Sequence, residues 1–141
     1  MNEVPKKAVG ARIVGVLIQK MLPNGLEVIV GSTRDPTFGP VVMFGLGGIF
    51  VEVLKDVSFR VVPVSDLDAD EMIREIKGYK VLEGYRGQPP RDVEAIKEII
   101  VKVSKLMEEL DYIQDMDLNP IIVYEKGKGA YVADARVIIR S

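Results

Sequence analysis

Short apolar segments separated by turn residues dominate the first half of the chain. Residues 26–31, LEVIVG, alternate so that one face of a strand carries three aliphatic side chains and the other carries Glu27 with Ile29. An apolar segment at Ile13–Gln19 precedes it, and Asn24-Gly25 predicts a tight turn joining the two as antiparallel strands. Residues 40–44 and 57–64 predict two further strands. These patterns favour a mainly antiparallel sheet.

Apolar residues spaced three and four positions apart then predict a helix. After Pro89-Pro90, apolar residues recur at that spacing: Val93, Ile96, Ile100, Val103, Met107 and Leu110. They predict an amphipathic helix over Asp92–Leu110 of about five turns, which must cover the sheet. A shorter helix is expected to begin at Asp68, because Asp68 followed by Glu71 resembles a capping box. This helix would turn Met72, Ile73 and Ile76 inward.

The closing stretch DMDLNPIIVYEKGKGAYVADARVIIR predicts a long hairpin. With KGKG as a four-residue loop, Glu125 pairs with Ala130. The same register pairs Asn119 with Arg136 and makes Asp134 a diagonal neighbour of Asn119. Diagonal neighbours lie roughly 7–8 Å apart, a gap that a hydrated cation can bridge.

Oxygen-bearing side chains occupy alternate positions in the first strand of this hairpin: Asp115, Asp117 and Asn119. Together with Asp134, they offer the oxygen-only ligands that suit Mg²⁺, which is usually completed by waters and phosphates. The alternative is a half-exposed strand with a solvated polar face. Spacing alone leaves both interpretations open.

Composition narrows the possible chemistry. The chain has 141 residues, no Cys, no His and a net charge of −2, so disulfides, thiolate metal sites and histidine catalysis within the chain are excluded. Nothing indicates a nucleic-acid or membrane partner. The first 12 residues are too polar for a signal peptide and no apolar run is long enough to cross a bilayer. We expect a single cytoplasmic domain.

Three charged residues have both a structural and a functional interpretation. Arg34, in TRDPTFGP, and Arg60, within a predicted strand, are either anion ligands or structural side chains. Glu27 is either a surface charge or an acceptor for a ribose or an amine. The GLGG segment at residues 45–48 could approach a phosphate, although it lacks the Lys-Ser/Thr ending of a Walker loop.

From about Ile13 onward, these motifs in their order resemble the carboxy-terminal part of the ATP-grasp domain in ADP-forming acetyl-CoA synthetases (acetate–CoA ligases). A more distant similarity runs to the beta subunit of succinyl-CoA synthetase. The resemblance implies an α+β fold, with a mainly antiparallel sheet and one long and one short helix packed on it. It implies one domain over residues 1–141, the second half of an ATP-grasp domain, with residues 1–12 as a linker or the approach to a hinge.

The resemblance also implies a nucleotide site at the start of the chain. Two Glu residues of the family, eight positions apart, fall at Gln19 and Glu27. Gln19 departs from the acid, which is tolerable if backbone groups hold the adenine. Leu22 falls at a third nucleotide-contacting position, where the backbone matters more than the side chain.

For the metal, the family's Mg²⁺ ligands match Asn119 and Asp134. Its acidic residue two positions before the Asn, placed to meet the metal or a phosphorylated histidine, matches Asp117. Arg34 and Arg60 are then candidates for neutralising phosphate charge.

The implied cofactors are ATP/ADP and Mg²⁺, and the implied reaction converts an acid, ATP and CoA into acyl-CoA, ADP and phosphate through a phosphohistidine. The family's relay histidine belongs to a CoA-binding alpha subunit or domain, and its amino-terminal ATP-grasp subdomain has no counterpart in this chain. We therefore expect half of an active site, from a split subunit or a fragment. A binding or assembly module without turnover is the alternative. Neither the acid nor the oligomeric state is indicated.

Overall fold

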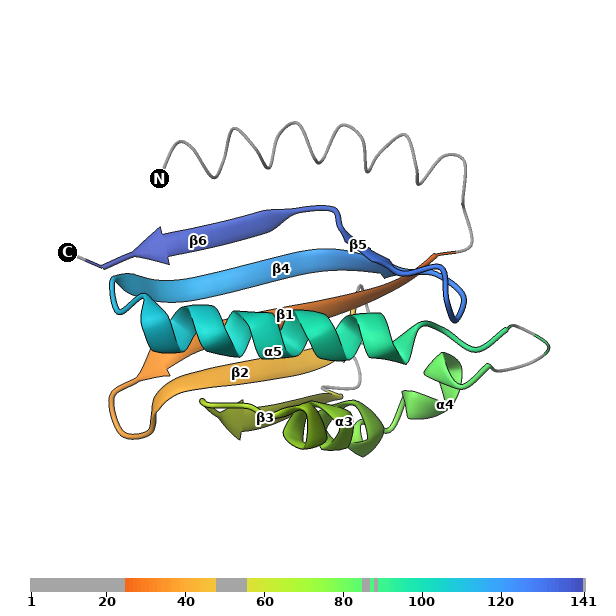
Figure 1. Ribbon diagram of the computed structural model, residues 1–141, viewed down its shortest axis with the longest axis horizontal. Coiled ribbons are helices and arrows are strands. Elements are labelled where there is room, and N and C mark those ends of the chain that lie inside the picture. Colours follow the sequence, from red (N-terminus) through yellow and green to blue (C-terminus); the bar gives the residue numbers. More distant parts are fainter. Residues whose placement is uncertain (1–24, 48–55, 85–86, 88, 141) are drawn as a thin grey trace.

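The computed structural model describes residues 25–47, 56–84, 87 and 89–140, and the structural statements below concern these residues. The expected strand Ile13–Gln19, the linker 1–12 and the nucleotide-contacting candidates Gln19 and Leu22 lie outside them. The elements, labelled as in Figure 1, are β1 (Leu26–Asp35), β2 (Gly39–Leu46), β3 (Val57–Val61), α3 (Asp66–Glu75), α4 (Tyr79–Leu82), α5 (Val93–Glu109), β4 (Ile113–Val123), β5 (Ala130–Val132) and β6 (Ala135–Ile139).

The strands form one antiparallel sheet in the order β3-β2-β1-β4-β5, with β6 also pairing with β4. Strands β5 and β6 follow one another along the same side of β4 (Figure 1). The long helix α5 crosses one face of the sheet, and α3 lies beside β3. The α+β fold with a mainly antiparallel sheet is confirmed. The four-residue helix α4 was not predicted from the sequence.

The amphipathic pattern of α5 correctly predicted which residues face the sheet. Ile96, Ile100 and Met107 are fully buried. They pack with side chains from one face of β1, β2 and β4: Val28, Val30, Val42, Phe44 and Ile121. Asp92 caps the helix, because its carboxylate accepts a hydrogen bond from the Ala95 N–H at 3.1 Å. The expected helix packed across one face is confirmed.

The shorter helix begins earlier than expected. Ser65, not Asp68, is the N-cap: its hydroxyl accepts from the Asp68 N–H, and the Asp68 carboxylate accepts from the Ser65 N–H, both at 3.1 Å. Asp68 thus occupies the third helical position (N3) of the capping box, a place usually held by Glu or Gln. Met72, Ile73 and Ile76 are buried as predicted.

The register of the closing hairpin differs from the prediction by two residues. Ala130 pairs with Val123 rather than Glu125, and Arg136 pairs with Asp117 rather than Asn119. The loop is longer than KGKG because β4 ends at Val123, so Tyr124 and Glu125 leave the strand. Glu125 instead forms a bridge with Arg91, and the Lys126 N–H donates to the Pro90 carbonyl at 2.9 Å. Where the strands are regular, an even shift keeps each side chain on its expected face and changes only its neighbours.

No described helix has both the length and the apolar composition needed to span a membrane.

Candidate functional site

The face of the sheet opposite α5 carries a continuous row of side chains. Gly31 of β1 pairs with Met43 on one side and Asp117 on the other. Met43 pairs in turn with Phe59, and Asp117 with Arg136. Residues paired across antiparallel strands project from the same face. This row, which we call the open-face row, therefore brings five strands together around Asp117.

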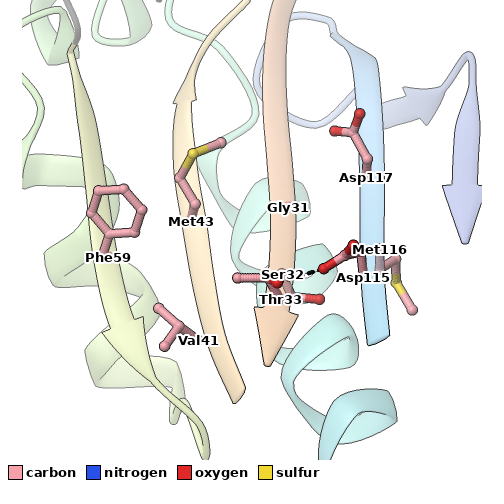
Figure 2. A pocket seen from close by; sticks show the side chains of 9 residues that line it. All are labelled: Gly31, Ser32, Thr33, Val41, Met43, Phe59, Asp115, Met116 and Asp117. Carbon is pink, nitrogen blue, oxygen red and sulfur yellow. Dashed lines mark hydrogen bonds between the residues drawn. The ribbon is translucent and has the colours of Figure 1, made fainter. Parts of the chain in front are cut away.

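A pocket of about 280 Å³ lies over this row. Figure 2 shows Phe59 and Met43 on one side of it and the carboxylates of Asp115 and Asp117 on the other, with Gly31 between them. The Thr33 hydroxyl donates to the Asp115 carboxylate. The pocket combines apolar walls with one acidic edge, the composition of a site for a partly apolar group that donates a hydrogen bond or carries positive charge.

Asn119 and Asp134 come together at the next position along β4. The Asn119 N–H donates to the Asp134 carbonyl oxygen at 3.1 Å, so the two residues lie opposite one another rather than diagonally. The Asp134 carboxylate accepts from the Ala135 N–H at 2.9 Å. Both side chains are exposed. Asn119 in β4 thus lies opposite Asp134, which belongs to the short segment between β5 and β6, in a register that differs from the predicted one.

A β-bulge accompanies this pair. β1 and β4 pair as Val28–Ile121 and as Val30–Leu118, so two residues of β4, Asn119 and Pro120, stand against Ile29 alone. An extra residue ends the simple alternation of side chains and redirects those at the bulge, a device frequent beside active sites. The direction of the Asn119 side chain is therefore set by the bulge and not by the alternation that Asp115 and Asp117 follow.

The donor set of this region fits a hard divalent cation. It offers the carboxylates of Asp117 and Asp134 and the amide oxygen of Asn119, and such cations prefer oxygen ligands. Within the described residues, no group of three acidic side chains lies close enough to hold a metal without further ligands. This composition suits Mg²⁺, which keeps several waters and takes phosphate oxygens as ligands.

Glu27 lies on the same face, nearer the start of β1. It pairs with Ile122 of β4 and its side chain is exposed. Its carbonyl oxygen accepts from the Gly47 N–H at 2.8 Å. A Cβ on Gly47 would lie 3.0 Å from the Glu27 Cβ, so the glycine allows this close approach. The structure thus places Glu27 and Asp117 on one face of the same pair of strands.

Arg34 points to the other face, where it caps the carboxy-terminal end of α5. Its guanidinium donates to the carbonyl oxygens of Met107 at 2.7 Å, Leu110 at 2.8 Å and Ile113 at 2.6 Å. Carbonyls at a helix C-terminus lack helical partners and carry partial negative charge, so a guanidinium is well suited to them. These contacts support the structural interpretation of Arg34, and the structure does not bring it together with Asp117.

Arg60 is likewise separated from Asp117 and the other acidic residues of the open face. It pairs across the sheet with Val42, a fully buried residue on the helix side. Its guanidinium forms a bidentate ion pair with Glu75 of α3 at 2.7 and 3.2 Å, and lies 3.8 Å from Glu71. The expected grouping of both arginines with Asp117 is therefore not seen: alternate residues of a strand face opposite sides, and β1 and β3 each turn their arginine toward the helices.

The Arg60–Glu75 pair provides a test in solution. The hydrogen bond from Arg60 lowers the pKa of Glu75 below its ordinary value. A carboxylate whose pKa is lowered in the folded state stabilises the fold at pH values above its unfolded-state pKa. This stabilisation is lost as the pH falls through the folded-state pKa. Because the pair is half exposed, we expect it to contribute less than about 1 kcal/mol to the free energy of unfolding. Arg60→Ala should raise the Glu75 pKa in an NMR pH titration, whereas Arg74→Ala, which breaks a pair with Asp70, should not. An unchanged pKa in Arg60→Ala would contradict the assignment.

Of the residues that line the pocket, the sequence singled out only Asp115 and Asp117. Gly31 appeared only as one letter in a strand, and Thr33 carried no signal of its own. A mid-strand glycine that breaks an apolar alternation was the available clue, since glycine there marks a bulge or a close approach.

Comparison with known proteins places this geometry in a family. The ATP-grasp domain profile matches residues 1–139. The beta subunit of acetate–CoA ligase (ADP-forming) II from Pyrococcus furiosus is 59% identical over 131 residues, which are 92% of this chain and 56% of that subunit. Acetate–CoA ligase (ADP-forming) I from Archaeoglobus fulgidus is 48% identical over 139 residues, which are 99% of this chain and 20% of that protein.

A solved structure has the same fold. The dinucleotide-forming acetyl-coenzyme A synthetase 1 of Candidatus Korarchaeum cryptofilum, in complex with coenzyme A and Mg-AMPPCP, superposes with a TM-score of 0.79 at 54% identity. The match covers 84% of this chain and 55% of that one. The chain thus spans about half the length of the beta subunit and the solved chain it matches. With the profile match over almost its whole length and a fold shared at this identity, the chain belongs to the ATP-grasp domain family.

Proposed function

We propose that this chain is the nucleotide- and Mg²⁺-binding half of an ADP-forming acyl-CoA synthetase, an acetate–CoA ligase. The observation that carries the proposal is the hydrogen-bonded adjacency of Asn119 in β4 and Asp134 between β5 and β6, with Asp117 two residues before Asn119 on the open face. The relatives named above support it, because their names give that activity and one was solved with a magnesium nucleotide. ATP or ADP and Mg²⁺ are the proposed cofactors.

Each residue has a distinct proposed role. Asn119 and Asp134 would hold the cation, and bound Mg²⁺ supplies charge neutralisation for nucleotide phosphates. Glu27, at the other end of the same face, would accept hydrogen bonds from the nucleotide, with Gln19 and Leu22 contributing from the preceding segment. Asp117 would position a group that receives phosphate. Arg34 and Arg60 would act only indirectly, since their contacts fix α5 and α3 against the sheet.

The proposed site needs further groups. The described residues supply one open face, with a pair of proposed cation ligands and a pocket. They supply nothing that would enclose a nucleotide from the other side. We propose that an amino-terminal ATP-grasp subdomain closes the cleft, and that a CoA-binding alpha subunit or domain carries the histidine that relays phosphate. The boundaries of the domain, residues 1–141 with a linker at 1–12, and a cytoplasmic location remain predictions.

The 141 residues assayed alone are expected to make no acyl-CoA from acetate, ATP and CoA. Half of the cleft would be missing, and the chain contains no histidine for the relay. The measurement is CoA-thioester formation by the purified chain, with and without an added histidine-bearing subunit and amino-terminal subdomain. Turnover by the chain alone would contradict the proposal. Binding of the partners without turnover in the full mixture would favour the assembly module.

A further inference from the structure

Gly31 occupies a place where the backbone does not require glycine. It lies in the middle of the ten-residue strand β1 and pairs with both neighbouring strands. Its φ is not in the left-handed region, unlike that of Gly39, at 77°. Glycine inside a strand weakens it, because the chain loses more freedom on folding and no side chain packs.

Packing does not require glycine here either. A Cβ on Gly31 would lie 3.5 Å from the Met116 carbonyl oxygen, 3.8 Å from the Met43 Cε and 3.9 Å from the Asp117 Oδ1, all ordinary contact distances. Gly78 differs, because a Cβ there would come within 2.4 Å of Leu46. The fold would therefore accept alanine at position 31. The missing side chain is better explained by what approaches the site.

The free space lies beside the carboxylate of Asp117. Gly31 forms the floor of the open-face pocket between Met43 and Asp117 (Figure 2). A methyl group at this position would stand against the carboxylate, and a larger side chain would fill the floor. A flat group resting there would have the Met43 side chain on one side and a hydrogen-bond acceptor on the other.

We propose that Gly31 is a specificity-determining residue. By lacking a side chain, it leaves room beside Asp117 for a planar, nitrogen-containing aromatic ring, the imidazole of the partner's relay histidine. This inference rests on the proposed function. An imidazole fits the observed chemistry because its ring faces tolerate apolar contacts while its N–H donates to a carboxylate. Gly31 acts through the space it leaves, and Asp117 is the residue that touches the ring.

The test compares Gly31→Ala and Gly31→Val in the fully assembled enzyme. We expect melting temperatures at or above that of the wild type and nucleotide dissociation constants within about twofold. Single-turnover transfer of labelled phosphate from ATP to the histidine should fall about tenfold for Ala and on the order of 100-fold for Val, since small misplacements of a reacting group have effects of this size. The control is Val61→Ile, which enlarges an exposed side chain on the same face, two strands from β1, and should leave transfer unchanged.

Transfer at the wild-type rate in both Gly31 variants would overturn the inference. So would a lower melting temperature in Gly31→Ala, since packing would then need the glycine, or a tenfold loss of nucleotide affinity, since Gly31 would then contact the nucleotide. Asp117→Asn tests the proposed function separately: if it loses transfer while the Gly31 variants do not, only the inference about Gly31 fails.

Discussion

Replacing Asp134 by Asn in the assembled enzyme is expected to reduce turnover on the order of 100-fold or more, the scale seen when one preorganised contact to developing charge is removed. The change removes the negative charge of a proposed Mg²⁺ ligand while keeping its size and an oxygen acceptor. Asp134 is exposed, and an Asn oxygen can still accept from the Ala135 N–H, so the free energy of unfolding should change by no more than about 1 kcal/mol. Turnover, unfolding and nucleotide-dependent binding of Mn²⁺, followed by electron paramagnetic resonance, are the three measurements.

The matched control is Asp111→Asn. Asp111 is also exposed, and it lies between α5 and β4, before the first residue of the strand that carries Asn119. The variant makes the same change in charge away from the proposed ligands, so turnover and Mn²⁺ binding should match the wild type. Full metal-dependent activity in Asp134→Asn would show that Asp134 is not a metal ligand. Equal losses in both variants would point to a general effect of charge and would equally contradict the assignment.

Arg34→Ala is expected to destabilise the folded chain by about 2–4 kcal/mol, because hydrogen bonds from a charged donor each contribute about 1.5–3 kcal/mol and do not add fully. The variant leaves the carbonyls of Met107, Leu110 and Ile113 without their shared donor at the point where α5 turns into β4. Chemical denaturation monitored by circular dichroism measures the change. Arg34→Lys should recover only part of it, since an ammonium group cannot reproduce the fork of a guanidinium.

The control is Arg60→Ala, which removes the same side chain from a half-exposed ion pair and should cost less than about 1 kcal/mol. If Arg34→Ala costs no more than Arg60→Ala, the proposed closure of α5 by Arg34 is wrong. If instead it leaves stability unchanged and abolishes phosphate transfer, Arg34 is the anion ligand that the sequence allowed as its alternative.

Within the regular helices and strands, the face of each side chain was determined by the sequence. The period of α5 predicted its buried residues, and the alternation in β4 placed Asp115 and Asp117 on one side of the sheet. These patterns depend on the local geometry of helices and strands, so they hold whichever elements pack together. They also survived the error in the hairpin register, because a shift of two residues preserves the face.

The neighbours of each side chain were decided by the tertiary structure. Only the pairing of β1 with β4, two strands far apart in the chain, sets Gly31 beside Asp117. The bulge opposite Ile29 likewise arises from contacts between strands. So does the two-residue shift in the register of the hairpin, which places Asn119 across from Asp134. Arg34 and Arg60 had plausible anion-binding contexts in the sequence, yet α5 and α3 supply their acceptors. Periodicity specifies a direction from the backbone, whereas strand order and register depend on packing between distant segments, which no local pattern encodes.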